Sequence, residues 1–307
     1  MQQRVVGLQR GFDWNDIPVL LALAQRKSMR GAAEQLGVDV STISRRLAAA
    51  ESRLQTRLFI RSPEGYEATD AGRIFMEKAA AIEGDVRALI DVTRAESESH
   101  AGEVRITSVD ILIDHWLTPR IPQLLESHPD IGLRMIPDNQ VLSFTHSEAD
   151  LALRIARPPA DAAILMRRVG HIGMAVYGAR QYSDIPRSRW GDAPWLAFDD
   201  DLAEVQEMQW LKQIAPDASY RFRSSSASTL LRACQAGLGI GLLPCFGAEA
   251  AGLCRLSEGV ELRRELWLLR HRDATRVPRF RAVADWMADL AEAQSGWLGG
   301  TVGKNTV

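Results

Sequence analysis

Residues 28–61 read SMRGAAEQLGVDVSTISRRLAAAESRLQTRLFIR, and this stretch decides the fold of the first part of the chain. Apolar residues recur at helical spacing before Gly37, which is suited to end a short helix. A second helix, expected to begin at Ser41, carries Ile43 and Leu47 on the face to be buried and small polar residues and arginines on the other. Two short helices joined by a tight turn are typical of a helix-turn-helix, whose second helix enters the major groove of DNA.

The residues on either side extend this pattern to a winged helix-turn-helix. Asp13 or Asn15 can cap a first helix that runs to about Arg26. After the second helix of the motif, the apolar segment 58–60, a turn with Pro and Gly, and the segment 66–68 predict a small β-hairpin, the wing.

Charge is distributed unevenly along the chain. The net charge of the whole chain is only -2, yet eight basic residues stand against three acidic ones between Arg26 and Arg61. Such a local basic patch suits a polyanion at one end of the protein, although a solvated helix face would give the same pattern. Arg53 and Arg57 could equally be surface salt-bridge partners.

Side-chain direction on the two helices selects the candidate DNA contacts. We expect Ser41, Thr42 and Arg45 near base edges, because arginine can bridge guanine O6 and N7. We expect Ser44, Arg46 and Arg61 nearer phosphates. The start of the preceding helix should lie by the DNA backbone, through Ser28 and Arg30.

A long helix should follow, capped by Thr69 and running from about Asp70 to Ser97. Its apolar residues recur at steps of four and three, which is the pattern of helix pairing. Packing on its own domain is the alternative, but pairing between two chains is favoured because little of the chain remains to cover this face. The predicted dimerisation residues are Phe75, Ala79, Ile82, Val86 and Leu89.

Beyond residue 100 strands alternate with helices, which predicts an α/β domain with a mostly parallel sheet. The expected strands are 103–107, 131–136, 150–155, 220–223 and 240–243, and a helix should open at 224–228 and run through Gln235. The tail after Gly296 is rich in glycine and poor in apolar residues, and we expect it to be frayed.

With these pieces in order, the chain resembles a LysR-type transcriptional regulator nearly from end to end. The N-terminal signature includes Trp14, Ser28, Ala32-Ala33, Leu36, Ser41, Ser44-Arg45-Arg46, Glu51, Leu54, Leu58-Phe59, Arg61, Thr69 and Ala71-Gly72, and weaker matches are His128-Pro129, 149–154 and 234–244. Three positions depart from the family pattern: Gln55 replaces a glycine, Ala50 replaces a leucine, and Val40 stands where a base-reading residue is common.

The resemblance implies a multidomain α plus α/β fold. It would comprise a winged helix-turn-helix DNA-binding domain, a linker helix that dimerises, and an effector domain of two α/β subdomains that resemble type 2 periplasmic binding proteins. The boundaries would be 1–69, 70–99, 100–173 with 266–295 for subdomain I, 174–265 for subdomain II, and a tail at 296–307, with chain crossings near 170–174 and 264–268.

The resemblance also implies how such a protein works. It would be a bacterial homodimer or homotetramer that binds a partial inverted repeat in double-stranded DNA and contacts RNA polymerase. A small polar or anionic effector would bind between the subdomains, because helix starts at Ser108 and Ser224 offer free N–H groups. Plain helix capping explains these serines equally well. The candidate effector residues are Ser108, Val109, Asn139, Gln140, Arg154, Arg157, Ser224 and Ser225.

Other classes of function find little support in the residues. The run 199–201 of three aspartates is expected to be a solvated loop, the histidines are scattered, and the glycines at 237–241 follow a helix rather than opening one, so we expect no catalysis, no metal and no cofactor. Three cysteines without a CxxC pair indicate buried thiols in a reducing cytoplasm. Without a signal peptide or a membrane span, the alternative is a cytoplasmic solute-binding protein with no role in transcription.

Overall fold

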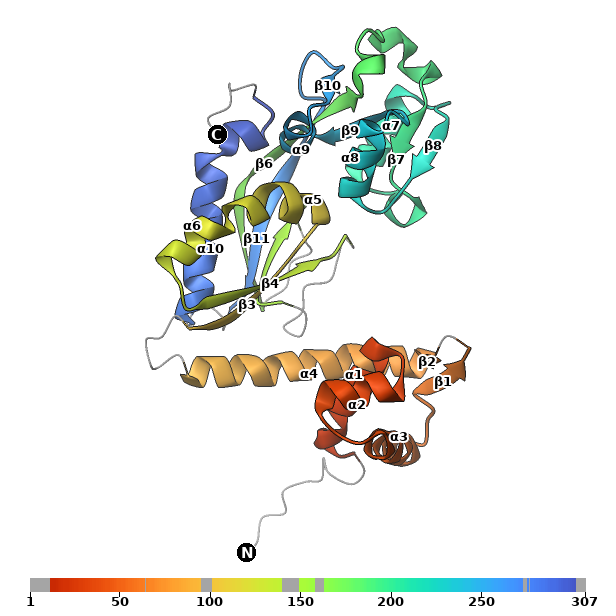
Figure 1. The fold of residues 1–307 in the computed structure, drawn as a ribbon, viewed down its shortest axis with the longest axis vertical. Coiled ribbons are helices and arrows are strands. Elements are labelled where there is room, and N and C mark those ends of the chain that lie inside the picture. Colours follow the sequence, from red (N-terminus) through yellow and green to blue (C-terminus); the bar gives the residue numbers. More distant parts are fainter. Residues whose placement is uncertain are drawn as a thin grey trace, which may run out of the picture. The chain divides into compact units, whose positions relative to one another are not determined.

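The protein is described by a computed structural model over residues 12–63, 65–94, 101–139, 149–157, 163–272, 275 and 277–301. The chain divides into two compact units, an N-terminal unit that ends at Ile90 and a C-terminal unit that begins at Asp91. Figure 1 draws the first in red to orange and the second from yellow to blue.

The N-terminal unit is a winged helix-turn-helix, as expected. Its core is formed by side chains that are fully or almost fully buried, among them Leu20, Leu23, Ile43 and Leu58. Its elements are η1 (Trp14–Asp16), α1 (Ile17–Arg26), α2 (Met29–Leu36), α3 (Val40–Leu54), β1 (Phe59–Ser62), β2 (Gly65–Ala68) and α4 (Asp70–Arg94). The two strands pair antiparallel as the wing.

Local signals in the sequence explain most of these boundaries. Gly37 ends α2 with a φ of 65°, the left-handed conformation that glycine adopts without steric cost. The Thr69 hydroxyl accepts a hydrogen bond from the Gly72 amide at 2.9 Å, so the predicted cap of α4 is confirmed. One boundary was wrong: α3 begins at Val40 rather than Ser41, after Asp39 as its N-cap residue.

The predicted dimerisation face of α4 splits into two parts. Ala79 is 2% exposed and belongs to the core of the N-terminal unit, and Phe75 and Ile82 pack against that core. These three residues therefore serve their own domain, which was the alternative. Val86 and Leu89, in the later part of the face, are 50% and 66% exposed.

A single nine-stranded sheet organises the C-terminal unit (Figure 1). Its strands are β3 (Gly102–Ser108), β4 (Ile131–Pro137), β5 (Leu151–Arg154), β6 (Ile164–Gly178), β7 (Trp195–Ala197), β8 (Tyr220–Arg223), β9 (Ile240–Pro244), β10 (Cys254–Arg255) and β11 (Leu262–His271). Their order is β4-β3-β5-β11-β6-β9-β7-β8, and β10 also pairs with β6. Four pairings are parallel and four are antiparallel, so the sheet is mixed rather than mostly parallel.

Two long strands join the two halves of this unit. We call the first half the part built on β3, β4 and β5, and the second half the part built on β7, β8 and β9. Strand β6 pairs with β11 over Ile164–Met174 and then with β9 over Met174–Gly178. The antiparallel pairings arise at these crossing strands, because β6 and β11 run in opposite directions between the halves.

Helices cover the sheet in both halves. They are α5 (Asp110–Leu112), the π-helical turn η2 (Ile113–Leu117), η3 (Thr118–Arg120), α6 (Ile121–Ser127), η4 (Arg180–Tyr182), η5 (Arg187–Asp192), η6 (Asp200–Leu202), α7 (Gln206–Ile214), α8 (Ala227–Gln235), α9 (Cys245–Ala250), α10 (Pro278–Ala293) and α11 (Ser295–Leu298). Three tryptophans, Trp116, Trp190 and Trp195, are fully buried beneath them.

The beginning of the predicted tail is not frayed. Leu298 is fully buried, and the Trp297 ring lies 5.4 Å from the ring of Phe246 and under the guanidinium of Arg120. The Gly173 backbone approaches so closely that a Cβ on it would lie 2.3 Å from the Gly299 carbonyl oxygen. Residues 302–307 lie outside the described residues.

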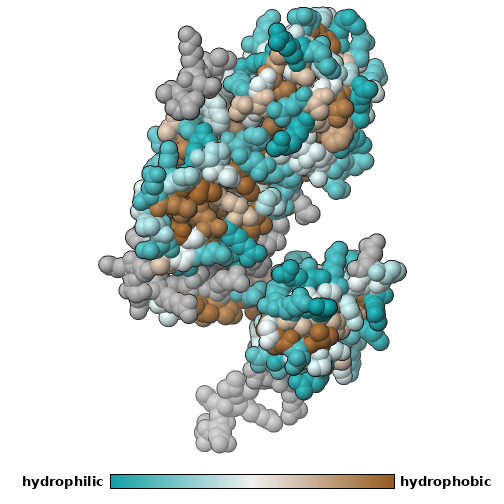
Figure 2. Space-filling view, in the orientation of Figure 1, coloured by the Kyte–Doolittle hydropathy of each residue, from teal (hydrophilic) through white to brown (hydrophobic). Residues whose placement is uncertain are grey.

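One surface feature of the C-terminal unit is a groove between α6 and α10, which has both apolar and charged residues in its lining. It is lined in part by Leu124, Trp286 and Leu290. Figure 2 shows brown side chains gathered over the region that Figure 1 labels α6 and α10.

Candidate DNA-binding and effector sites

The outer face of α3 is polar and cationic. Ile43 and Leu47 are buried, whereas Ser41, Ser44 and Arg45 are exposed and Thr42 is half-buried. Arg45 has no hydrogen-bond or ion-pair partner in the part of the chain that the structure describes. Its guanidinium is thus free to meet an anionic or hydrogen-bonding partner from outside.

Arg46 is used by the chain itself. Its guanidinium donates a 2.6 Å hydrogen bond to the Asn15 carbonyl oxygen and lies 3.8 Å from the Asp16 carboxylate. Arg53 pairs with the same carboxylate at 3.2 Å, so the salt-bridge alternative holds for Arg53. Burial raises the pKa of Asp16, against the opposing effect of the two arginines. These contacts fasten η1 to α3, and the phosphate contact predicted for Arg46 would compete with them.

The remaining predicted contacts lie at the start of α2 and on the wing. The Ser28 hydroxyl accepts a hydrogen bond from the Gly31 amide at 3.0 Å, which is a plain helix cap. Arg30 pairs with Glu34 at 2.9 Å, but both side chains are exposed and such pairs are weak. Arg61 is exposed on β1.

Two features beside the outer face of α3 were missed in the sequence. Arg57 is exposed and has no partner among the described residues, although its charge alone could not separate it from Arg53. Val38 and Val40 are 41% and 46% exposed at the start of α3, where apolar side chains normally turn inward. The sequence alone did not reveal that these two valines are exposed, because this depends on which face of α3 is buried.

A cavity of about 120 Å³ lies in the C-terminal unit where the two halves and the crossing strands meet. Its wall is formed by residues of the first half, of the second half and of β6, β9 and β11. They are Val109, Ile111, Asn139, Arg154, Ile155, Ala156, Arg157, Met174, Phe198, Leu202, Val205, Glu207, Ser225, Ala227, Pro244 and Arg264. Most of these side chains are apolar.

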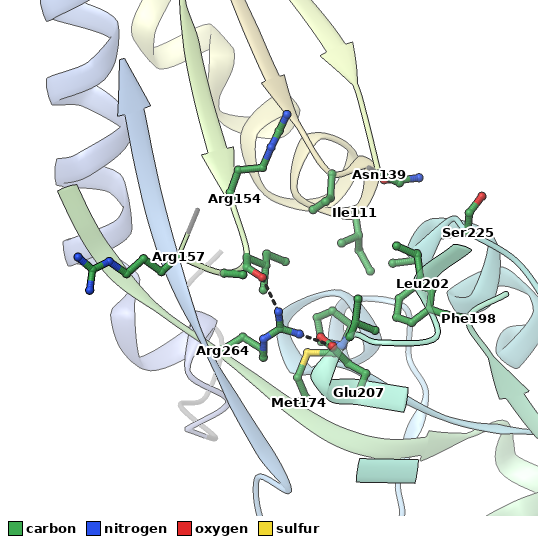
Figure 3. Close-up of a pocket in the computed structure, with 16 residues that line it drawn as sticks. Ile111, Asn139, Arg154, Arg157, Met174, Phe198, Leu202, Glu207, Ser225 and Arg264 are labelled. Carbon is green, nitrogen blue, oxygen red and sulfur yellow. Dashed lines mark hydrogen bonds and ion pairs between the residues drawn. The ribbon is translucent and has the colours of Figure 1, made fainter. Parts of the chain in front are cut away.

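Arg264 joins the two halves at this cavity (Figure 3). It projects from β11, pairs with Glu207 at the start of α7 in the second half, and donates a 2.7 Å hydrogen bond to the Ile155 carbonyl oxygen in the first half. The Arg264 and Glu207 side chains are only 8% and 10% exposed, so the pair is nearly dry.

Comparison with known proteins identifies both units. Residues 14–73 match the model of bacterial regulatory helix-turn-helix proteins of the lysR family, and residues 97–292 match the LysR substrate binding domain. The chain belongs to the LysR family of transcriptional regulators. It is 30% identical to the Mau operon transcriptional activator of Paracoccus denitrificans over 296 residues, which cover 93% of this chain and 99% of that protein.

Solved structures of full-length LysR-type regulators share the fold. CbnR matches with a TM-score of 0.63 at 17% identity, covering 90% of this chain and 99% of that chain. AphB, the virulence activator of Vibrio cholerae, matches with a TM-score of 0.58 at 21% identity and 91% and 99% coverage.

In this LysR-type regulator the two arginines predicted to supply charge to the effector are already engaged. Arg154 is buried, lies 3.2 Å from the Asp138 carboxylate and donates a hydrogen bond to the Thr107 hydroxyl. The Arg157 guanidinium stacks over the Trp267 ring at 5.5 Å. Figure 3 shows both side chains pointing away from the centre of the cavity.

The predicted polar contacts of the regulator are divided between the cavity and the protein itself. Asn139 lines the cavity, but its side chain exchanges hydrogen bonds with Asp110, at 3.1 Å to the amide and 3.2 Å to the carboxylate. Val109 and Ser225 also line the cavity. Ser224 accepts a hydrogen bond from the Ser226 amide.

Three predicted effector residues do not contribute to the described wall, namely Ser108, Ser224 and Gln140. Ser108 is fully buried and is not among the residues that line the cavity. Gln140 lies outside the described residues. The helix that was expected to open at Ser108 is a single α-helical turn, followed at once by the π-helical turn η2.

Several titratable residues of the regulator lie away from the cavity. Across the described ranges no group of three or more His, Cys, Asp or Glu side chains could hold a metal ion, and no described helix is long and apolar enough to cross a membrane. Burial raises the pKa of Cys234 to about 12 and also raises the pKa of Cys245, which makes both thiols poor nucleophiles. Asp200 of the aspartate run pairs with Arg223.

Proposed function

We propose that this regulator binds operator DNA as a homodimer through the outer face of α3, and that a small molecule in the cavity between the two halves controls it. The observation that carries the first part is Arg45, an exposed arginine without a partner among the described residues, beside Ser41 and Ser44 on the face opposite the buried one. A helix of this kind fits the major groove.

Within this proposal the residues divide by what they read. Arg45, Ser41 and Thr42 lie near base edges, where arginine recognises guanine and the hydroxyls accept or donate hydrogen bonds. The phosphates are contacted by exposed residues of α3, of the segments beside it and of the wing, namely Ser44, Arg30, Arg57 and Arg61. Ser28 positions the start of α2 through its cap.

Dimerisation is assigned to the exposed later part of α4. Val86, Leu89 and Ile90 are between 43% and 66% exposed, which is costly for large apolar side chains in a monomer. Two chains paired there present two copies of α3, so the operator is a partial inverted repeat with half-sites about one helical turn apart. The groove between α6 and α10, which is lined by apolar and charged side chains, is a second surface for a tetramer. Contact with RNA polymerase in the cytosol completes the proposal.

A DNA-binding comparison tests the assignment of α3. Footprinting the DNA upstream of the coding region locates an operator, and Kd values for operator and random DNA are then measured at one salt concentration. Arg45→Ala should reduce the preference for the operator by about 1–3 kcal/mol. Arg221→Ala, which removes an exposed arginine of the C-terminal unit, should leave it unchanged. Unchanged preference in Arg45→Ala would remove α3 as the reader.

A further inference from the structure

The chain supplies its own anion at the places where an anionic effector was expected. One oxygen of the Asp110 carboxylate accepts hydrogen bonds from the Ile111 amide at 2.6 Å and from the Ser228 amide at 3.4 Å. The other oxygen accepts a hydrogen bond from the Asn139 side chain at 3.2 Å. Free amides at helix starts attract anions, and here one carboxylate occupies the first turn of α5 and of α8.

The same contacts hold the two halves of the C-terminal unit together. Asp110 and Asp114 belong to the first half, whereas Ser228 belongs to α8 in the second half. The Ser228 hydroxyl donates a 2.7 Å hydrogen bond to the Asp114 carboxylate, in addition to the contact between its amide and Asp110. An effector anion placed at these helix starts would meet two carboxylates already in place.

Two of the three arginines in the cavity wall are also matched by a carboxylate, whereas the third, Arg157, is exposed and stacks over the Trp267 ring. Arg264 is paired with Glu207, both nearly fully buried, and Arg154 is paired with Asp138. A carboxylate ligand that took Arg264 for itself would leave Glu207 charged, buried and unpaired, and the same argument holds for an ammonium ligand that took Glu207. Neither a negative nor a positive charge on a ligand would therefore be compensated at this pair.

Apart from these charged groups the wall is largely apolar, and the cavity that it encloses is small. Ile111, Met174, Phe198, Leu202 and Val205 provide hydrocarbon and aromatic surface around about 120 Å³. In another protein an apolar cavity of about 150 Å³ binds benzene without any polar contact. The volume here therefore suits a single ring or a short branched chain.

We propose that the effector of this cavity is a small, uncharged and largely apolar molecule of about single-ring size. Anionic ligands are excluded because the Asp110 carboxylate already occupies the helix starts. This inference rests on the proposed function only in assuming that the cavity is the effector site. Ser225, at the exposed edge of the wall, is the side chain available to a single polar group of such a molecule.

Three probes that share one ring and differ in charge test the class of ligand. Benzyl alcohol, benzoate and benzylamine are titrated into the full-length protein at pH 7.5 by calorimetry, without DNA. Benzyl alcohol should bind at least ten times more tightly than either charged probe. Benzoate or benzylamine binding as tightly as benzyl alcohol, or no binding of benzyl alcohol, would overturn the proposal.

Variants locate the binding. Ala227→Leu fills the cavity and should weaken benzyl alcohol at least tenfold, whereas Ala250→Leu, at an exposed position at the end of α9, should not. If Ala227→Leu does not fold, Ala156→Leu at a half-buried position of the wall replaces it. Full affinity in the folded filling variant would place the probe elsewhere and overturn the proposal.

Asp110→Asn tests the role of the internal anion. It should narrow the difference in affinity between benzoate and benzyl alcohol at least threefold, because the amides at Ile111 and Ser228 lose their charged partner. An unchanged difference would overturn that role. Because the titrations contain no DNA, their failure is separate from the failure of operator binding, which the Arg45→Ala comparison measures.

Discussion

The buried pair of Arg264 and Glu207 offers a quantitative test of how the two halves of the C-terminal unit are joined. Each side chain is at most a tenth exposed, and Arg264 also serves the Ile155 carbonyl oxygen. Removing one partner of a buried pair leaves an uncompensated charge and costs about 3–5 kcal/mol. We therefore expect Arg264→Met and Glu207→Leu each to lower the free energy of unfolding by that amount.

The double variant should behave very differently from the sum of the single variants. With both charges gone, methionine and leucine add apolar contacts, and replacement of a buried pair by apolar residues is often neutral or stabilising. The Ile155 carbonyl oxygen still loses the hydrogen bond from Arg264, which costs about 1–3 kcal/mol when the group stays buried. The double variant should thus lie within about 3 kcal/mol of the wild type, with a coupling energy of several kcal/mol.

Urea unfolding followed by tryptophan fluorescence is the appropriate assay. Seven of the eight tryptophans lie in the C-terminal unit and only Trp14 lies in the N-terminal unit, so the signal reports on the unit that holds the pair. Arg168→Met, which breaks the largely exposed pair of Arg168 with Glu265, is the matched control and should cost less than about 1 kcal/mol. Additive single and double variants, or single variants that cost no more than the control, would refute the reasoning.

Four further predictions concern the N-terminal unit and α4. Exposed Val40 would contact the methyl group of one thymine in the operator, so replacing that thymine by uracil should weaken binding of the wild type but not binding of Val40→Ala. An equal loss of affinity in both proteins would contradict this. Val86→Asp with Leu89→Asp should convert the protein to monomers in analytical ultracentrifugation and weaken operator binding at least tenfold, and a dimer of full affinity would clear this face. Because burial raises the pKa of Asp16, the protonated carboxyl stabilises the folded state, and this contribution is lost as the pH rises from the ordinary value of 3.8 through the folded pKa. The wild type should therefore lose stability relative to Asp16→Asn over that rise in pH, and melting curves that diverge in the opposite sense would exclude it. Gln55→Gly should raise the free energy of unfolding by about 1 kcal/mol, because Gln55 has a φ of 52° and left-handed backbone is costly for residues with a Cβ; a lower stability would show that the side chain of Gln55 contributes more than the strain costs.

The N-terminal unit was predictable because its signals are local. Gly37 and Thr69 mark element boundaries through backbone conformation and capping, which depend on residues within one helical turn. Gln55 shows the same principle, because it stands where the family has a glycine and it adopts the left-handed backbone conformation that glycine favours. The wing and all four helices followed from such signals.

The face of α4 could not be assigned from spacing. Ala79 packs in the core of its own unit and Leu89 is exposed, yet both belong to one series of apolar residues at steps of four and three. A helix that packs on its own domain and a helix that packs on another chain need the same spacing, because both bury one stripe. The two kinds of helix can be distinguished only when the position of the rest of the domain's hydrophobic core is known.

The charges around the cavity depend on contacts between distant parts of the chain. Arg264 and Glu207 are 57 positions apart in the sequence. Arg154 at the end of β5 meets Asp138 just after β4 only because the sheet places these two strands on either side of β3. From the sequence Arg154 looked like a free cation after a strand, whereas Arg264 gave no signal at all. Because Arg154 is paired with Asp138, its charge is not available to a ligand. Arg264 lies at the cavity because it pairs with Glu207.

An effector can act on this protein only through a difference in affinity between two arrangements of the halves. The hydrogen bonds from Ser228 to Asp110 and Asp114 connect the two halves at the starts of α5 and α8, and the contacts of Arg264 with Glu207 and Ile155 connect them at the wall of the cavity. An apolar ligand that fills the space between them adds contacts to both halves at once, and these contacts are lost when the halves separate. Its binding free energy is therefore available to hold the halves together, whereas an anion would gain its contacts only by displacing Asp110 and thereby loosening the same closure.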